Sequence, residues 1–151
     1  MTDVLHEPVR RFIGEVAAVL ASVARHVESV KFGDLHHDVA VEAFNLVCGF
    51  VDADGRHSDD ELWALISAFG TALDSQLAGA TPEILRDAGM VRGKRTHLDQ
   101  PSAMFEILVE ADAKAGTSHA RTYYDRAMDL AFAVAAVDTV TSVTELEAIE
   151  A

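Results

Sequence analysis

The sequence predicts an all-α domain, a helical bundle built around an internal helix–acidic loop–helix repeat. Half of the 151 residues are apolar and only three are proline, a mixture that favours helices over a sheet. Apolar residues recur at the three- and four-residue spacing of amphipathic helices along most of the chain. Two acidic segments, 52–62 and 138–146, align without a gap, because 138 − 54 and 145 − 61 both equal 84. An internal repeat of this kind constrains the whole fold.

The first half of the chain is predicted to form three helices. The first covers about 6–31, where the apolar side chains fall on one face, and Gly33 follows as its C-cap. The second covers 34–54 and is apolar on most sides, so we expect it to be central and buried. The third covers about 58–77 and begins directly after the first acidic loop.

The second half begins with a short helix. Thr81 is its predicted N-cap, and the proline that follows suits the first helical position. Residues 89–99 are predicted to be irregular. Longer helices are then expected at about 101–115 and 117–137, and a last helix is expected at 142–151 after the second acidic loop.

The chain is predicted to be a single domain, residues 1–151, that leads into a further domain beyond Ala151. At this length one domain with a substantial core is expected. No C-cap signal follows the last helix, and its counterpart in the first repeat continues past the matching position, 67 (151 − 84). The expected partner is therefore a fused C-terminal domain or a separate protein.

Both acidic loops contain Ser-x-x-Glu before an apolar run, at 58–61 and 142–145. This pattern is a capping box, in which the serine and the glutamate satisfy backbone N–H groups at the start of a helix. The capping box does not explain Asp54 and Asp138, whose charges at the end of a helix oppose the helix dipole. A tight Asp-Gly turn at Asp54, a shared polar cluster or a bound cation would compensate for these charges, and we predict that the two loops lie side by side.

The segment 53–61, Ala-Asp-Gly-x-x-Ser-x-x-Glu, resembles the signature of the tellurite-resistance TerB-like family. That family pairs two helix–loop–helix units that carry acidic residues, and Asp138, Ser142 and Glu145 fit a degenerate second copy. Thr139 departs from the pattern, because it stands where the loop glycine is expected. The resemblance implies a non-catalytic interaction or regulatory module of a larger cytoplasmic protein, either a stress-response protein or an ATPase.

A divalent cation is the alternative function of the acidic loops. Hard cations prefer clustered carboxylate oxygens, so a metal-responsive domain would use both loops. The first loop is not an EF-hand, because its glycine and its final acidic residue fall at the wrong positions. The simpler alternative is that the carboxylates accept hydrogen bonds from loop N–H groups. No other cofactor is expected. The candidate metal ligands are Asp52, Asp54, Glu61, Asp138 and Glu145.

One basic patch interrupts the acidic chain, within the irregular stretch. It is either a solvated loop or a docking point for an acidic protein partner or a phosphate. A phosphate-binding P-loop is excluded, because the glycine and hydroxyl positions of that motif are not filled. The candidate partner-binding residues are Arg92, Lys94, Arg95 and His97.

Charge and composition exclude several classes of function. The formal net charge of −13 disfavours nucleic acid as a partner, since binding it requires a cationic surface. No apolar run reaches the length of a membrane span. The single Cys48, expected to be an inert thiol, cannot form an internal disulfide, which favours a reducing cytoplasm. No nucleophile–base pair is recognisable, so we do not expect an enzyme; the oligomeric state is left open.

Overall fold

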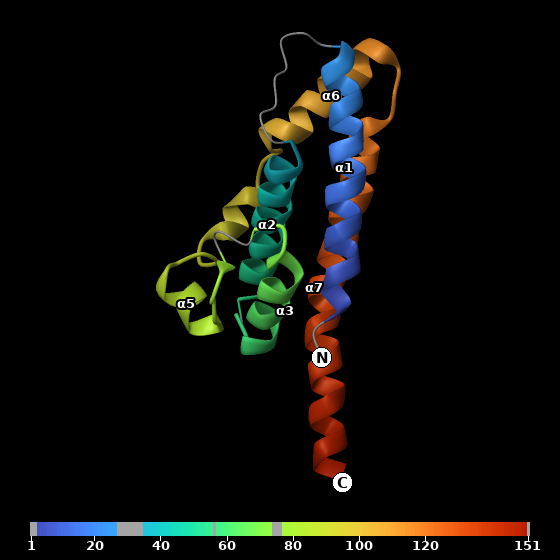
Figure 1. Ribbon diagram of the computed structural model, residues 1–151. Helices are drawn as coiled ribbons and strands as arrows, with labels where there is room; N and C mark the ends of the chain where they lie inside the picture. Colours follow the sequence, from blue (N-terminus) through green and yellow to red (C-terminus); the bar gives the residue numbers. More distant parts are fainter. Residues whose placement is uncertain (1–2, 27–34, 56, 74–76, 151) are drawn as a thin grey trace.

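The computed structural model describes residues 3–26, 35–55, 57–73 and 77–150. It describes the backbone alone for Asp3, residues 24–26, Asp54 and residues 138–150. In this part of the chain there are six α-helices and two short 3-10 helices, and there is no strand (Figure 1). The predicted all-α fold class is confirmed.

Three long helices form the body of the bundle. α1 (His6–His26) and α7 (His119–Glu150) lie side by side, and the short 3-10 helix η1 (Asp3–Leu5) leads into α1 (Figure 1). α2 (Leu35–Asp54) contacts α1, α3 and α7, so the central position predicted for it is confirmed. The predicted ends of the first two helices, at 31 and 34, lie outside the described residues. The core between these helices is apolar and includes Phe12, Val16, Leu20, Val47, Val51 and Leu130.

Local capping signals fix the shorter helices. α3 (Asp59–Phe69) follows the N-cap Ser58, and α5 (Pro82–Asp87) follows the N-cap Thr81, as predicted. α6 (Ala103–Ala115) starts after Ser102, whose hydroxyl accepts from the Phe105 N–H, and ends at Gly116 in the left-handed region (φ 70°). The start of α7 is capped from α6, because the Asp112 carboxylate accepts from the N–H groups of His119 and Ala120.

The stretch 89–99 is less irregular than predicted. It contains the 3-10 helix η2 (Lys94–Leu98), which lies against α2. The approach is close at Gly49, where a Cβ atom would lie 3.1 Å from the carbonyl oxygen of Lys94. The absence of a side chain at Gly49 is therefore what allows η2 to pack on the C-terminal half of α2.

The helix predicted at 58–77 is too long. α3 ends at Phe69, with Gly70 at its C-cap and turns over 70–73. Leu73 and Leu77 are buried nevertheless, so their apolar spacing correctly indicated burial against the core. Glycine at position 70 lowers helix propensity by about 1 kcal/mol relative to alanine, which favours termination there.

The predicted second acidic loop is wrong, because α7 is one continuous helix through residues 138–142 (Figure 1). In the first loop the backbone turns at Gly55 (φ 78°) and His57 (φ 46°). The equivalent positions, 84 residues later, are Thr139 and Thr141. A β-branched residue is strongly disfavoured at positive φ, so the second segment cannot make the same turn. The chain therefore contains one helix–acidic loop–helix unit in the described structure.

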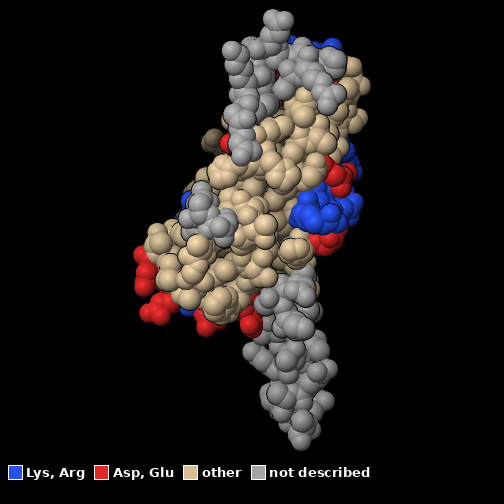
Figure 2. Space-filling view, viewed as in Figure 1, with Lys and Arg blue, Asp and Glu red and all other residues tan. Residues whose placement is uncertain are grey.

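The surface is acidic but unevenly so. Acidic side chains gather at the α5 end of the face in Figure 2, and acidic and basic side chains lie next to each other on the opposite edge. Arg126 of α7 pairs with Glu15 of α1 (3.6 Å), which links the two long helices, and with Asp129 of α7 itself (3.4 Å). No helix in the described ranges is long and apolar enough to cross a lipid bilayer.

Candidate functional site

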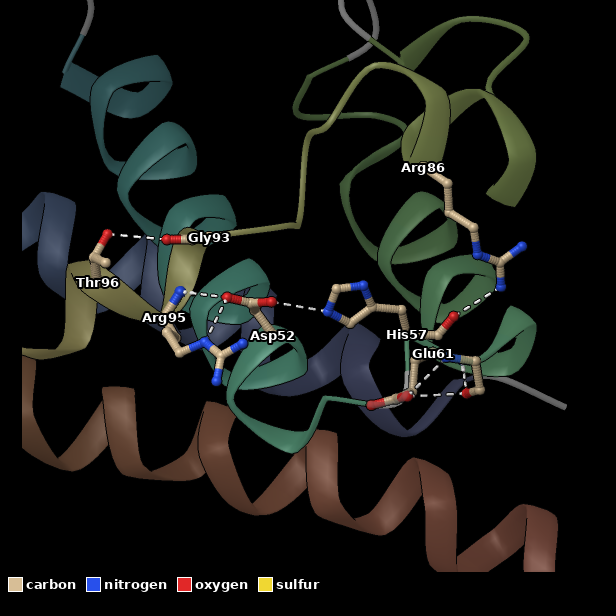
Figure 3. A network of polar contacts seen from close by, with 8 residues as sticks. Asp52, His57, Glu61, Arg86, Gly93, Arg95 and Thr96 are labelled. Atoms are coloured by element: carbon tan, nitrogen blue, oxygen red, sulfur yellow. Dashed lines mark hydrogen bonds and ion pairs between the residues drawn. The ribbon is translucent and has the colours of Figure 1, made fainter.

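The acidic loop and the basic patch predicted from the sequence meet at Asp52 (Figure 3). Asp52 is almost fully buried at the C-terminal end of α2 (1% exposed). Its Oδ2 accepts from the backbone N–H of Arg95 (3.0 Å) and from the Arg95 guanidinium Nε (3.2 Å). Its Oδ1 lies 2.9 Å from Nε2 of His57. Asp52 therefore fastens η2 and the loop after α2 to the end of that helix.

These contacts stabilise the charged form of Asp52. The hydrogen bond from the Arg95 backbone N–H lowers the pKa of the carboxyl group, and burial opposes this effect. The His57 hydrogen bond and the positive charge of Arg95 lower the pKa further. The net pKa lies below its ordinary value, so Asp52 is an anion at neutral pH.

Ser58 and Glu61 form the predicted capping box. The Ser58 hydroxyl accepts from the Glu61 N–H (3.2 Å), and the Glu61 carboxylate accepts from the Ser58 N–H and hydroxyl (3.0 Å each). Glu61 is almost fully buried (1% exposed). Arg86 of α5 supports the same loop, because its guanidinium donates to the His57 carbonyl (2.7 Å, Figure 3). The guanidinium also pairs with Asp59.

The Ser58→Ala substitution should lower the free energy of unfolding by about 1 kcal/mol, because it removes the N-cap of α3. Ser58→Thr keeps a capping hydroxyl and should cost less. Ser142→Ala is the matched control: residue 142 lies inside α7, so no cap is lost. Urea denaturation of the three variants checks this. Equal destabilisation by Ser58→Ala and Ser142→Ala would contradict the assignment of the cap.

The remaining candidate metal ligands cannot be placed. The side chains of Asp54, Asp138 and Glu145 lie outside the part of the chain whose side chains are described. The predicted closeness of the two acidic segments therefore stays a prediction. Among the side chains that are described, no three from His, Cys, Asp and Glu are arranged to hold a metal ion. The cation site stays a prediction.

The residues of the predicted partner-binding patch have different neighbours in the fold. Arg95 pairs with Asp52, and His97 lines a cleft. Arg92, Arg95 and His97 are exposed and Lys94 is half-buried. The partner-binding role of these four residues stays a prediction.

A cleft that His97 lines is a candidate binding site. It has a volume of about 580 Å³ and lies between α2, η2, the start of α6 and α7. Its walls are mostly apolar and aromatic, as is common in binding sites. The side chains that form these walls include Leu46, Phe50, Leu98, Phe105, Tyr124 and Met128.

Two carboxylates line this cleft, those of Asp99 and of Glu42 of α2. The Glu42 Oε2 accepts from the Tyr123 hydroxyl (2.6 Å) and from the Ser102 hydroxyl. Burial raises the pKa of Tyr123 well above its ordinary value, and the charge and hydrogen bond of Glu42 add to this effect. The phenol is therefore always protonated and acts as the donor. Glu42 joins α2 to α6 and α7 at the base of the cleft.

The apolar surface continues from the cleft along α7. Tyr124 lines the cleft and is 52% exposed, and Phe132 is 67% exposed. Tyr124, Met128 and Phe132 follow one another at intervals of four residues, so they share one face of the helix. Leu98 of η2 is exposed at the mouth of the cleft. Exposed aromatic side chains arranged in this way are typical of a binding surface.

A second cleft, of about 710 Å³, lies between α1, the start of α2 and the end of α3. Three histidines and Arg10 line it: His6, His36 and His37. Arg10 also pairs with Glu7 at the surface, at 2.6 Å. The floor consists of small and aliphatic side chains.

The sequence analysis missed Glu42, Ser102 and Tyr123 as a group. A signal was present, because Glu42 is the only charged residue between Val39 and Val51 in an apolar helix. A charge in such a position must find polar partners. Cys48 in the same helix behaves as predicted: it is buried, and burial raises the pKa of its thiol to about 12.

Comparisons of the chain with family models, curated proteins and solved structures found no match. The geometry of the cleft therefore carries the functional argument.

Proposed function

We propose that this domain is a non-catalytic interaction module that binds an apolar segment of a partner protein in the cleft between α2, η2 and α7. The observation that carries the proposal is the cleft itself, with the aromatic surface of α7 that continues from it. Tyrosine and phenylalanine are enriched at interfaces because they bury a large area at a small cost in conformational entropy.

The form of this surface favours a polypeptide over a small ligand. A small ligand would be held within the cleft, and Phe132, two turns along α7 from Tyr124, would remain exposed to water. A partner segment that runs along α7 would cover Tyr124, Met128 and Phe132 together. The partner is a separate protein or a domain fused to this chain.

The wider setting rests on the TerB-like resemblance. We propose on that basis a cytoplasmic stress-response or ATPase-type protein as the setting. The resemblance loses one part of its support, because the continuous helix α7 replaces the second helix–loop–helix unit. The first loop, with Gly55, Ser58 and Glu61, retains the signature.

Selection of peptides from a random phage library on the purified domain tests the proposal. We expect enriched peptides to contain aromatic and aliphatic residues and to bind Tyr124→Ala at least about tenfold more weakly, a loss of roughly 1.4 kcal/mol. Trp63→Ala is the matched control, because Trp63 is 45% exposed on α3 and lies outside the cleft. The Trp63→Ala variant should bind the enriched peptides with the same affinity as the wild type.

Met128→Glu provides a second test at the same surface, because it adds a charge to an apolar wall of the cleft. The proposal fails if no peptide is enriched. It also fails if the enriched peptides bind Tyr124→Ala and Met128→Glu as tightly as they bind the wild type.

A further inference from the structure

We infer that the cleft takes an arginine side chain from the partner segment, and that Glu42 is the carboxylate that pairs with its guanidinium. The inference rests on the proposed function and specifies the chemistry of the partner. It follows from three observations: the unused oxygen of Glu42, the aromatic walls around it, and the charge of the chain.

The Glu42 carboxylate uses only one of its two oxygens in the described hydrogen bonds. Both of its hydrogen bonds reach Oε2, from the Ser102 and Tyr123 hydroxyls. None of the described basic side chains forms an ion pair with it, and no described group donates to Oε1. A half-buried carboxylate such as that of Glu42 is stabilised by a positive charge that also donates hydrogen bonds. The cleft therefore lacks the partner that would complete this site.

The surroundings of Glu42 hold the carboxylate in place. Ser102 is the N-cap of α6, and its hydroxyl is fixed by the N–H of Phe105 (3.1 Å). The Tyr123 ring packs between Phe12 and Phe105, with centroids 5.3 and 5.1 Å away. Neither donor is free to rotate away, so Oε2 is anchored and Oε1 is left for a ligand. Such preorganisation lowers the entropic cost of binding.

The walls of the cleft favour arginine over lysine. Phe50, Phe105 and Tyr124 contribute aromatic rings to the cleft that Glu42 also lines. A guanidinium is planar, stacks on such rings and is less strongly hydrated than an ammonium group. Its methylene groups would pack on Leu46 and Met128. Arginine is also one of the residues most enriched at interface hot spots.

The net charge of the whole chain also favours a basic partner segment. A net charge of −13 attracts basic segments and repels acidic ones, and the attraction weakens as salt is added. A partner segment with arginine among apolar residues meets both features of the surface.

The rival explanation is that Glu42 only joins α2 to α6 and α7. Peptides from the phage selection distinguish this explanation from the binding of an arginine by Glu42. We expect arginine to be enriched among them, and replacement of that arginine by citrulline to weaken binding at least about tenfold. Citrulline has nearly the same shape as arginine but no charge, so the comparison needs no change in the protein.

Glu42→Gln tests the same contact from the side of the protein. The glutamine amide oxygen still accepts from both hydroxyls, so the fold should persist, as a thermal melt will show. We expect Glu42→Gln to bind the arginine peptide about tenfold more weakly and to bind the arginine and citrulline peptides equally. Glu106→Gln, on α6 but outside the cleft, is the matched control and should bind like the wild type.

The two proposals can fail separately. Peptides that lose affinity for Tyr124→Ala but bind equally with arginine or citrulline would support the interaction module and overturn the role of Glu42. Peptides whose arginine is required, but whose affinity falls equally in Glu42→Gln and Glu106→Gln, would also overturn it. Peptides insensitive to Tyr124→Ala overturn the module itself.

Discussion

Phe12→Ala should lower the free energy of unfolding by about 3–5 kcal/mol, the usual range for removing a buried phenylalanine ring. Phe12 is completely buried where α1 packs on α7. Its ring meets Tyr123 edge to face, with centroids 5.3 Å apart and an angle of 69° between the planes. The substitution removes this aromatic pair and leaves a cavity behind Tyr123.

The same substitution should also weaken peptide binding, although Phe12 does not line the cleft. Without the ring, Tyr123 is free to shift, and the Glu42 carboxylate loses one fixed donor. Urea denaturation measures the stability, and anisotropy of a labelled peptide measures the binding. Phe12→Leu is the control, because it fills most of the volume and should cost about 1 kcal/mol. A loss below 1 kcal/mol for Phe12→Ala would contradict the packing of α1 on α7.

Much of the helical structure was predictable because its signals are local. The caps at Ser58, Thr81 and Gly116 depend on residues within one turn of each helix end. The Glu61 side chain that completes the first capping box lies only three residues from its partner. Such signals are read directly from the sequence.

The second acidic loop shows why a matching pattern was not sufficient. Acidic and serine residues at 138, 142 and 145 are compatible with a helix interior as well as with a loop. The distinguishing feature is the backbone, because the turn after α2 requires positive φ at Gly55 and His57. The weak point in the alignment was Thr139, at the position of that glycine.

The candidate site depended on contacts between distant residues. Glu42 meets Ser102 and Tyr123 across 60 and 81 positions of the chain. Arg95 meets Asp52 across 43 positions, and this pairing joins an acidic segment to a basic one that the sequence analysis had treated as two separate sites. Pairings of this kind follow from how helices pack, which helix periodicity alone does not determine.

Asp52→Ala should lower the free energy of unfolding by about 2 kcal/mol, because it removes hydrogen bonds to a buried charged group. The N–H of Arg95 would lose its acceptor, and η2 would lose its attachment to the end of α2. The Arg95 side chain is 62% exposed and can be hydrated instead, which keeps the cost below that of breaking a fully buried ion pair. Asp52→Asn retains an acceptor and should cost about half as much.

This contribution should also depend on pH in a definite direction. The pKa of Asp52 is lower in the folded protein, so between the two pKa values the unfolded chain binds more protons. The stabilisation is therefore fully present above about pH 5 and is lost as the pH falls below the ordinary aspartate pKa of about 3.9. The difference in unfolding free energy between the wild type and Asp52→Asn isolates it from other carboxylates, including Asp112, whose pKa is also lowered. That difference, measured by urea denaturation from pH 7 to pH 3, should be constant at first and then shrink. A difference that does not shrink between pH 5 and pH 3 would mean that Asp52 is not stabilised as an anion by Arg95 and His57.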